Sequence, residues 1–264
     1  MDSKISARIS SSAKKPAFIP FVVAGYPNLE TTKKILKCLD ENNAACIELG
    51  LPFSDPLADG PIIQQAAKHA LDNGVNTDKV FELLNNLKDS IKAPIIIFTY
   101  YNLILNYGIE NFVKTAKDAN VAGFIVPDLP IEESNDFSHF CKEHMLDHIL
   151  LIAPTSKEER INELAKKSAG FIYLVSSTGV TGVRDSFSGM LSDIAAKIKS
   201  TTDTPIAVGF GVSKPQHIKE LNSLGINGAI VGSALIKIIH DNIANEQEIL
   251  NQLRAYIQEL YSEV

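Results

Sequence analysis

Short apolar segments alternate with longer amphipathic segments along most of the chain. The apolar segments are rich in β-branched residues and almost continuous in hydrophobicity, which is typical of parallel strands covered on both faces. Eight such segments occur, at residues 17–23, 45–49, 94–99, 121–126, 148–152, 170–175, 204–208 and 226–231. The pattern therefore predicts eight strands separated by helices.

Apolar residues at spacings of three and four predict the helices. The clearest candidates are residues 29–42, 109–119, 134–144, 157–168 and 216–224. We also expect an extra terminal helix over about residues 246–261 and a short helix in the first dozen residues.

Eight β/α units in a chain of 264 residues favour a (β/α)8 TIM barrel with additional terminal helices. The alternative is an open, doubly wound sheet, which a G-x-G-x-x-G motif after the first strand would support. Residues 25–28 read Gly-Tyr-Pro-Asn and do not supply that motif. No linker or shift in composition divides the chain, so we expect residues 1–264 to form a single barrel domain.

Composition narrows the class of protein further. Hydrophobic residues make up 45% and charged residues 21% of the chain, which excludes collagen-like and low-complexity proteins. No apolar run approaches the roughly 20 residues that span a bilayer, and the first residues lack the apolar core of a secretory signal. A cytoplasmic protein is expected, with Cys38, Cys46 and Cys141 as buried thiols.

The formal net charge of −6 and the lack of a Lys and Arg cluster argue against nucleic acid as a partner. An anionic small molecule would have to be held by local backbone dipoles rather than by the overall field of the protein.

One carboxylate, Glu48, lies within the second predicted strand. An unpaired ionised carboxylate in an apolar segment costs several kcal/mol, so the group must be paired, solvated by a cleft or protonated. A raised pKa would suit a group that gives and takes protons near neutrality. The alternative is a structural carboxylate bonded to a neighbouring strand.

The segment that follows this strand is unusually long, as is the segment after the sixth strand. Loops after strands lie on the catalytic face of a barrel, so both are candidate lids or site loops. Residues 52–61 combine Asp55 and Asp59 with three prolines and a glycine, which makes the loop stiff. The aspartates either face a ligand or merely cap the next helix.

Glycine-rich segments follow the last three strands, at residues 179–182, 209–213 and 232–234. Barrel enzymes often bind phosphate with the loops after strands seven and eight and a helix N-terminus, where glycine lets backbone N–H groups approach the anion. Any one such segment is more often a simple cap, but three in these positions favour a phosphate site.

Two other chemistries are disfavoured. No lysine lies in a strand core, which argues against a Schiff-base aldolase. The cluster His139, Cys141, His144 and His148 falls on a predicted helix and the start of a strand, the wrong end for a barrel site, so we expect solvated helix positions and no metal. The residues alone thus predict carboxylate acid/base chemistry on a phosphorylated metabolite.

From residue 17 onwards the chain resembles the tryptophan synthase alpha subunit family. The longest and most specific match is residues 48–61, and shorter matches are residues 17–21, 24–25, 126–130, 179–182, 209–211 and 232–234. Tyr26 stands where members of that family often carry Asp.

The resemblance implies a carbon–carbon lyase of tryptophan biosynthesis that cleaves indole-3-glycerol phosphate to indole and glyceraldehyde 3-phosphate by a retro-aldol step. Glu48 would be the general acid and base at C3 of the indole, and Asp59 would accept the indole N–H. Substrate-binding residues carried over by the resemblance are Phe21, Phe98 and Phe210 around the ring, Tyr173, Thr181 in a closing loop, and Gly182, Gly211, Gly232, Ser233 and Ala234 at the phosphate.

The resemblance also implies a partner. Members of the family form an alpha2beta2 heterotetramer with a beta subunit, whose pyridoxal phosphate joins indole to serine, so no cofactor is expected in this chain. Pro52, Asp55 and the segment around Asn102 resemble the residues that contact the beta subunit. The alternatives are a free-standing lyase that releases indole and a catalytically silent barrel that regulates its partner.

Overall fold

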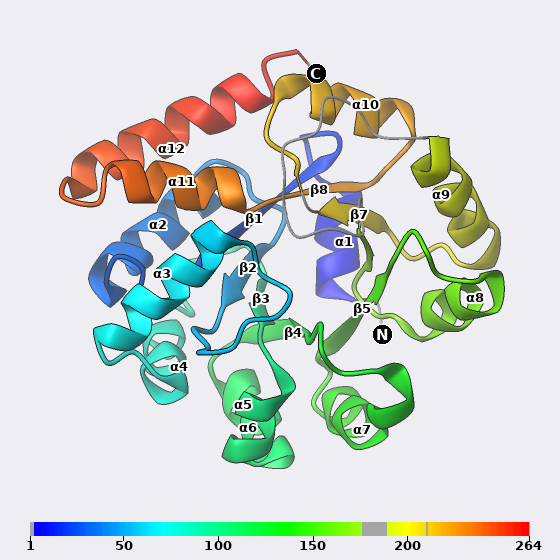
Figure 1. Ribbon diagram of the computed structural model, residues 1–264, viewed down its shortest axis with the longest axis horizontal. Coiled ribbons are helices and arrows are strands. Elements are labelled where there is room, and N and C mark those ends of the chain that lie inside the picture. Colours follow the sequence, from blue (N-terminus) through cyan, green and yellow to red (C-terminus); the bar gives the residue numbers. More distant parts are fainter. Residues whose placement is uncertain (1–2, 176–188, 210, 264) are drawn as a thin grey trace.

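Eight parallel strands close into a barrel in the order of the sequence, with β1 paired to both β2 and β8. The structure is a computed structural model that describes residues 3–175, 189–209 and 211–263. Figure 1 shows the strands in the middle of the molecule and the helices around them. The strands are β1 (Ala17–Val23), β2 (Ile47–Gly50), β3 (Ile95–Phe98), β4 (Val121–Ile125), β5 (Asp147–Ile152), β6 (Ile172–Val175), β7 (Ile206–Gly209) and β8 (Gly228–Val231). The predicted closed barrel is confirmed.

Helices follow the strands around the ring. They are α1 (Lys4–Ser10), α2 (Leu29–Glu41), α3 (Pro61–Asp72), α4 (Thr77–Asn85), α5 (Tyr101–Tyr107), α6 (Ile109–Asp118), α7 (Asn135–Glu143), α8 (Glu158–Lys167), α9 (Gly189–Thr201), α10 (Pro215–Ser223), α11 (Ser233–Asp241) and α12 (Glu246–Leu260), with a short 3-10 turn η1 (Ile131–Glu133). No helix in the described part of the chain is both long and apolar enough to cross a membrane.

The hydrophobic pattern of the strands reflects burial on both faces. Every residue of β1, β2, β3, β7 and β8 is buried, because one face lines the barrel interior and the other is covered by helices. The predicted strands therefore match the observed ones to within about two residues at each end. The predicted helices are also found, including α1 and α12.

The long segment after β2 was predicted as a lid or site loop, and this is only partly right. About half of its length forms α3 and α4, and residues 51–60 form the loop directly after the strand. Asn76 caps α4 by accepting a hydrogen bond from the Lys79 N–H, and Pro61 begins α3. The segment predicted as a second lid, after β6, lies outside the described residues at positions 176–188.

Helix α1 covers the N-terminal end of the barrel. Its Ile5 and Ile9 are fully buried. The Ser3 hydroxyl donates to the Asp147 carboxylate at the start of β5, and the Ser6 hydroxyl donates to the Gly170 carbonyl just before β6. At the opposite end of the barrel, the C-terminal ends of the strands lead into the loops that form the site.

The three cysteines are buried free thiols, as predicted. Burial raises the pKa of each thiol, and for Cys46, inside the barrel wall at the start of β2, the rise is large. These thiols therefore act as small apolar side chains.

We predict that Gly123→Ala destabilises the barrel. A Cβ at Gly123 would lie 2.6 Å from the Asp147 carbonyl oxygen and 3.1 Å from Ile5 Cδ1, so the backbone of β5 or helix α1 would have to move. Such overpacking lowers the free energy of unfolding by about 1–3 kcal/mol, measurable by urea denaturation.

The matched control is Gly189→Ala, where a Cβ would meet no atom within 4 Å. Because alanine favours helix, this variant should unfold at the same or a slightly higher urea concentration. Equal stability of the two alanine variants would contradict the role assigned to Gly123.

Candidate active site

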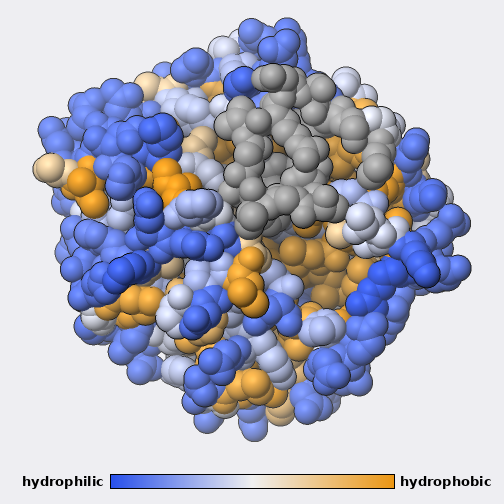
Figure 2. All heavy atoms as spheres, in the orientation of Figure 1, coloured by the Kyte–Doolittle hydropathy of each residue, from blue (hydrophilic) through white to orange (hydrophobic). Residues whose placement is uncertain are grey.

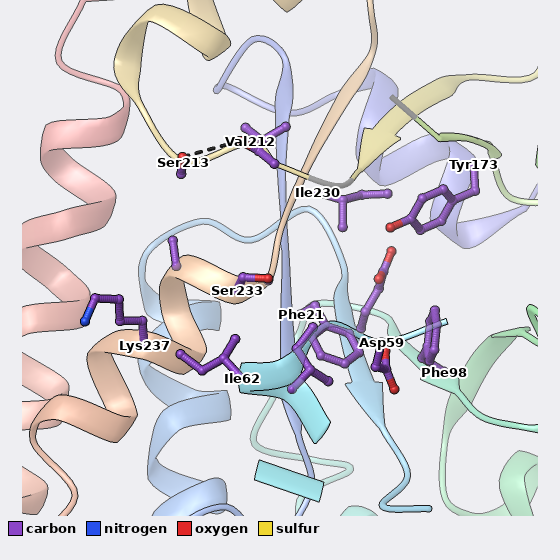
Figure 3. Close-up of a pocket in the computed structure, with 15 residues that line it drawn as sticks. Phe21, Asp59, Ile62, Phe98, Tyr173, Val212, Ser213, Ile230, Ser233 and Lys237 are labelled. Carbon is purple, nitrogen blue, oxygen red and sulfur yellow. Dashed lines mark hydrogen bonds between the residues drawn. The ribbon is translucent and has the colours of Figure 1, made fainter. Parts of the chain in front are cut away.

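A cavity of about 320 Å³ opens at the ends of the strands where the predicted site residues gather. Figure 3 shows side chains from β1, β3 and β6 and from the segments after β2, β7 and β8 around one space. The lining residues are Phe21, Glu48, Asp59, Ile62, Ile63, Phe98, Tyr173, Gly211, Val212, Ser213, Ile230, Gly232, Ser233, Ala234 and Lys237. The lining is mainly apolar, with two carboxyl groups on one side.

Glu48 is the most enclosed charged residue of the cavity. It sits on β2 beside Phe21 of β1, and its side chain is only 1% exposed. Its Oε1 atom has no hydrogen-bond partner among the described residues. Burial therefore raises the pKa of Glu48 well above the usual value of a glutamate, which favours the protonated acid near neutral pH. The alternative of a carboxylate bonded to a neighbouring strand finds no support at Oε1.

Asp59 is the second carboxyl group of the cavity. It ends the loop after β2 and is buried just before α3, whose N-cap is Gly60 and makes no side-chain capping bond. The alternative that Asp59 caps this helix is therefore wrong. Burial raises the pKa of Asp59 to about 6, while a hydrogen bond from Tyr100 opposes that rise.

Tyr100 is a site residue that the sequence analysis missed. Its hydroxyl donates to Asp59 Oδ2 over 3.0 Å and accepts the Ala58 N–H over 3.1 Å. Its ring stacks on Phe53 of the same loop with the centroids 5.2 Å apart. One side chain after β3 thus fastens the loop and orients Asp59. Neither Tyr100 nor the adjacent Tyr101 lines the cavity itself, and only Tyr100 is bonded to Asp59. The position of Tyr100 directly after a strand was a usable signal, but Tyr101 shares it.

Tyr173 reaches the cavity from β6, as Figure 3 shows. Burial, reinforced by the charges of Glu48 and Asp59, raises its pKa well above that of a free phenol, so the hydroxyl stays protonated. Gly209 at the end of β7 makes room for it, because a Cβ there would lie 2.1 Å from the Tyr173 oxygen. The glycine predicted for phosphate binding therefore serves the packing of a tyrosine.

Phe21 and Phe98 form an apolar wall. Their rings meet edge to face with centroids 5.5 Å apart, and both line the cavity. Gly50 at the end of β2 leaves space for Phe21, since a Cβ there would lie 2.9 Å from its Cζ atom. A planar apolar group fits beside such a wall.

The third side of the cavity is the N-terminus of α11. Gly232 is its N-cap and Ser233 its first residue, and both line the cavity together with Ala234. Gly211, with a φ of +99°, contributes backbone from the segment after β7. Free N–H groups and the helix dipole make this side suitable for an anion. Gly182, predicted to join it, lies outside the described residues, as do Thr181, predicted in the closing loop, and Phe210, predicted around the ring.

Lys237 also lines the cavity and was not predicted. It lies one helical turn after Ser233, and its ammonium group pairs with Asp241 at 2.8 Å. Because backbone groups suffice for an anion, the sequence pattern pointed only to the N-terminus of this helix. The spacing of four residues from Ser233 was the available signal.

The residues predicted to contact a partner lie beside the cavity but do not line it. Asp55 and Asn102 are exposed, on the loop after β2 and on α5, whereas Pro52 is buried within this chain. Contact with a partner through these residues stays a prediction.

One member of the histidine cluster near α7, His148, differs from the expectation of solvated positions. His148 is buried, because β5 turns it toward α7, where its Nδ1 atom and the Ser138 hydroxyl lie 2.9 Å apart. Burial lowers the pKa of His148 to about 4. No three His, Cys, Asp or Glu side chains in the described part of the chain are grouped as a metal site.

Comparison with known proteins agrees with this arrangement. The family model described as tryptophan synthase alpha chain matches residues 8–264. The tryptophan synthase alpha chain of Prochlorococcus marinus strain MED4 is 45% identical over 260 residues, which cover 98% of this chain and 92% of that protein. That of Arabidopsis thaliana is 44% identical, with 98% of this chain and 94% of that protein covered.

Solved structures show the same relation. Mycobacterium tuberculosis tryptophan synthase superimposes with a TM-score of 0.89 at 31% identity, over 99% of this chain and 98% of the other. A structure of the tryptophan synthase alpha2beta2 complex of Pyrococcus furiosus has a TM-score of 0.87 at 37% identity, with coverages of 94% and 99%. With the family model matched over almost all of its length, the chain belongs to the tryptophan synthase alpha chain family.

Proposed function

We propose that this chain, a member of a lyase family, cleaves indole-3-glycerol phosphate into indole and glyceraldehyde 3-phosphate. The observation that carries the proposal is the pair Glu48 and Asp59 in one apolar cavity, where burial raises the pKa of Glu48 well above its usual value and that of Asp59 to about 6. Two carboxyl groups in different environments can act as an acid and as a fixed charge at the same pH.

The proposed reaction is a proton transfer followed by a retro-aldol cleavage. Glu48 donates its proton to C3 of the indole, and the ring nitrogen becomes cationic. The proton of the adjacent glycerol hydroxyl then passes to the Glu48 carboxylate as the aldehyde C=O forms. The bond between C3 and the glycerol carbon breaks, and its electron pair restores the neutral aromatic ring. The protons balance, because Glu48 is protonated again at the end of the reaction.

Asp59 supplies negative charge where positive charge develops. Its carboxylate accepts the indole N–H, and the bond from Tyr100 favours the ionised form that this role needs. The apolar surroundings strengthen this interaction, since few polar groups compete in the cavity. Phe21 and Phe98 would contact the indole ring and Tyr173 the reacting end of the glycerol.

The phosphate is proposed to bind at the opposite side of the cavity. Gly211, Gly232, Ser233 and Ala234 line that side, where their backbone N–H groups would bind the anion and the dipole of α11 would favour it. On the resemblance alone, Gly182 is proposed at the phosphate, Thr181 in the loop that closes over the substrate and Phe210 beside the indole ring. We also propose that this chain needs no cofactor of its own and acts in the cytoplasm.

A beta subunit is the proposed partner, with pyridoxal phosphate bound to that subunit. The support in this chain is exposed apolar surface close to the predicted contacts. Leu57, on the same loop as Asp55, is 84% exposed, and Leu105, on the same helix as Asn102, is 51% exposed. Figure 2 shows apolar atoms toward the middle of this view and mostly hydrophilic atoms around its rim. Large exposed side chains of this kind are typical anchors of an interface.

The direct test of the proposed acid is Glu48→Gln. The substitution removes the transferable proton, so indole release, measured by a colorimetric indole assay, should fall about 100- to 10,000-fold. Stability should be kept, because a protonated glutamate and a glutamine are both neutral. The control is Glu82→Gln, at an exposed position of α4, which should retain full activity. More than a tenth of the activity remaining in Glu48→Gln would contradict the mechanism.

The pH dependence of the reaction tests Asp59. Asp59 must be ionised, so kcat/KM should rise with pH through the Asp59 pKa of about 6. Tyr100→Phe removes a bond that lowers this pKa, so the rising limb should move to higher pH. At pH 6 we expect a loss of about two- to fivefold beyond any loss at pH 8. The control Tyr101→Phe should leave the profile in place, and an identical shift in both variants would refute the assigned contact.

The partner is tested with Leu57→Asp. A charge on this exposed apolar side chain should weaken the apparent affinity for a tryptophan synthase beta subunit about tenfold, seen as the concentration that half-maximally stimulates indole release. Activity without the beta subunit should not change, since Leu57 does not line the cavity. Met145→Asp, an equal change at a residue 61% exposed before β5, is the control. If both variants respond alike, or stimulation is absent in the unaltered chain, the proposed interface fails.

A further inference from the structure

A second and larger cavity lies at the other end of the strands, away from the proposed active site. It has a volume of about 920 Å³ and is lined by the segments that lead into β3, β4 and β5 and by α7; we name it the basal groove. Helices α7 and α8 both pack on β5, and α7 also packs on α6. Figure 1 shows α7 and α8 on either side of β5.

Lysines dominate the charge of the basal groove. Five line it, and four of them, Lys4, Lys92, Lys117 and Lys142, form no ion pair with any described residue. The fifth, Lys167, pairs with Glu163 at 3.0 Å. This excess of positive charge contrasts with the net charge of −6 of the whole chain. Like charges gathered in one concave surface repel one another, and an anion bound between them would relieve that repulsion.

One acidic side chain, Asp147, lines the basal groove. It already accepts a hydrogen bond from the Ser3 hydroxyl of α1, so it is held at the edge where α1 meets β5. Four of the five lysines are therefore left without an ion-pair partner in the described part of the chain.

A ring nitrogen of a histidine is also accessible from this cavity. His148 lines the groove and is only 7% exposed. Its Nδ1 atom is occupied by the Ser138 hydroxyl, while its Nε2 atom has no hydrogen-bond partner among the described residues and is not among their fully buried polar atoms. The Nε2 atom is therefore available to a polar group of a ligand in the groove. A hydroxyl beside Nδ1 can donate or accept, which lets Nε2 do either as well.

The remaining wall of the groove is apolar. Val121, Leu146 and Leu150 contribute aliphatic surface, and Met145 lies at the edge with 61% of its surface exposed. A methionine is adaptable and polarisable, which suits contact with an aromatic ring. A ligand of the groove would therefore need an apolar body as well as negative charge.

We propose that the basal groove binds a small organic polyanion, an aromatic body that carries several phosphate- or sulfonate-type groups. The charged groups would lie among Lys92, Lys117 and Lys142, and the aromatic body would lie on the apolar wall, with a polar atom at His148 Nε2. The volume of the groove falls within the range of about 300–1,000 Å³ that is usual for small-molecule sites. This site does not depend on the proposed lyase function.

The test uses 1,3,6-naphthalenetrisulfonate as the probe and the full chain labelled with 13C at its methionine methyl groups. The chain has three methionines, so the Met145 signal can be identified by its loss in Met145→Leu. Titration at constant ionic strength should shift the Met145 signal and saturate, because the aromatic ring lies against this side chain. No saturable shift of the Met145 signal would overturn the proposal.

Two variants with the same change in net charge locate the anion. Lys92→Gln combined with Lys142→Gln should raise the dissociation constant about fivefold, whereas Lys33→Gln combined with Lys37→Gln, on α2 outside the groove, should leave it unchanged. Equal effects of the two pairs would overturn the assigned site. A shift of the Met145 signal by sulfate alone, as large as that by the probe, would also overturn it.

The proposal can fail or stand independently of the lyase function. Glu48→Gln should bind the probe with the same affinity as the unaltered chain, because Glu48 lines the other cavity. Loss of probe binding in Glu48→Gln would place the probe in the active site and refute the basal groove.

Discussion

The burial of one carboxyl group determines how the site is built. Glu48 sits in a wall of the barrel where water is excluded, and its Oε1 atom finds no hydrogen-bond partner in the described part of the chain. Taking an ionised carboxylate into such a place is costly, so the barrel favours the protonated acid. The fold thus stores a proton at a position where the free side chain in water would have lost it.

The neighbours of Glu48 are arranged around this constraint. Glycines at the ends of β2 and β7 give space to Phe21 and Tyr173, so large apolar and phenolic groups enclose the acid. Asp59 is less deeply buried than Glu48 and accepts a hydrogen bond from Tyr100, so burial raises its pKa to about 6. The two carboxyl groups therefore differ in burial and in hydrogen bonding, because Glu48 Oε1 has no donor among the described residues.

Much of this arrangement was predictable from sequence. Continuous apolar runs identify strands buried on both faces, and a single Glu within such a run identifies the acid, because both signals are local. The predicted set Phe21, Phe98, Tyr173, Gly211, Gly232, Ser233 and Ala234 does line the cavity, but its contact with a ligand remains a proposal. Other features were not predictable. They are the contacts of Tyr100 and Lys237, the burial of His148 and the two helices in the long segment after β2, and each depends on which face of an element is buried. That choice is made by packing between distant segments and leaves little trace in the local pattern.

Tyr100 serves two partners with one oxygen, the backbone of the loop at Ala58 and the carboxylate of Asp59. Neither partner can be exchanged alone without disturbing the other, and Phe53, stacked on the same ring, is tied to both. In the evolution of such a chain these positions would be inherited as a unit. A lineage that lost the phenol would have to find a new donor for the acid and a new anchor for the loop in the same step, which makes this corner of the barrel slow to diverge.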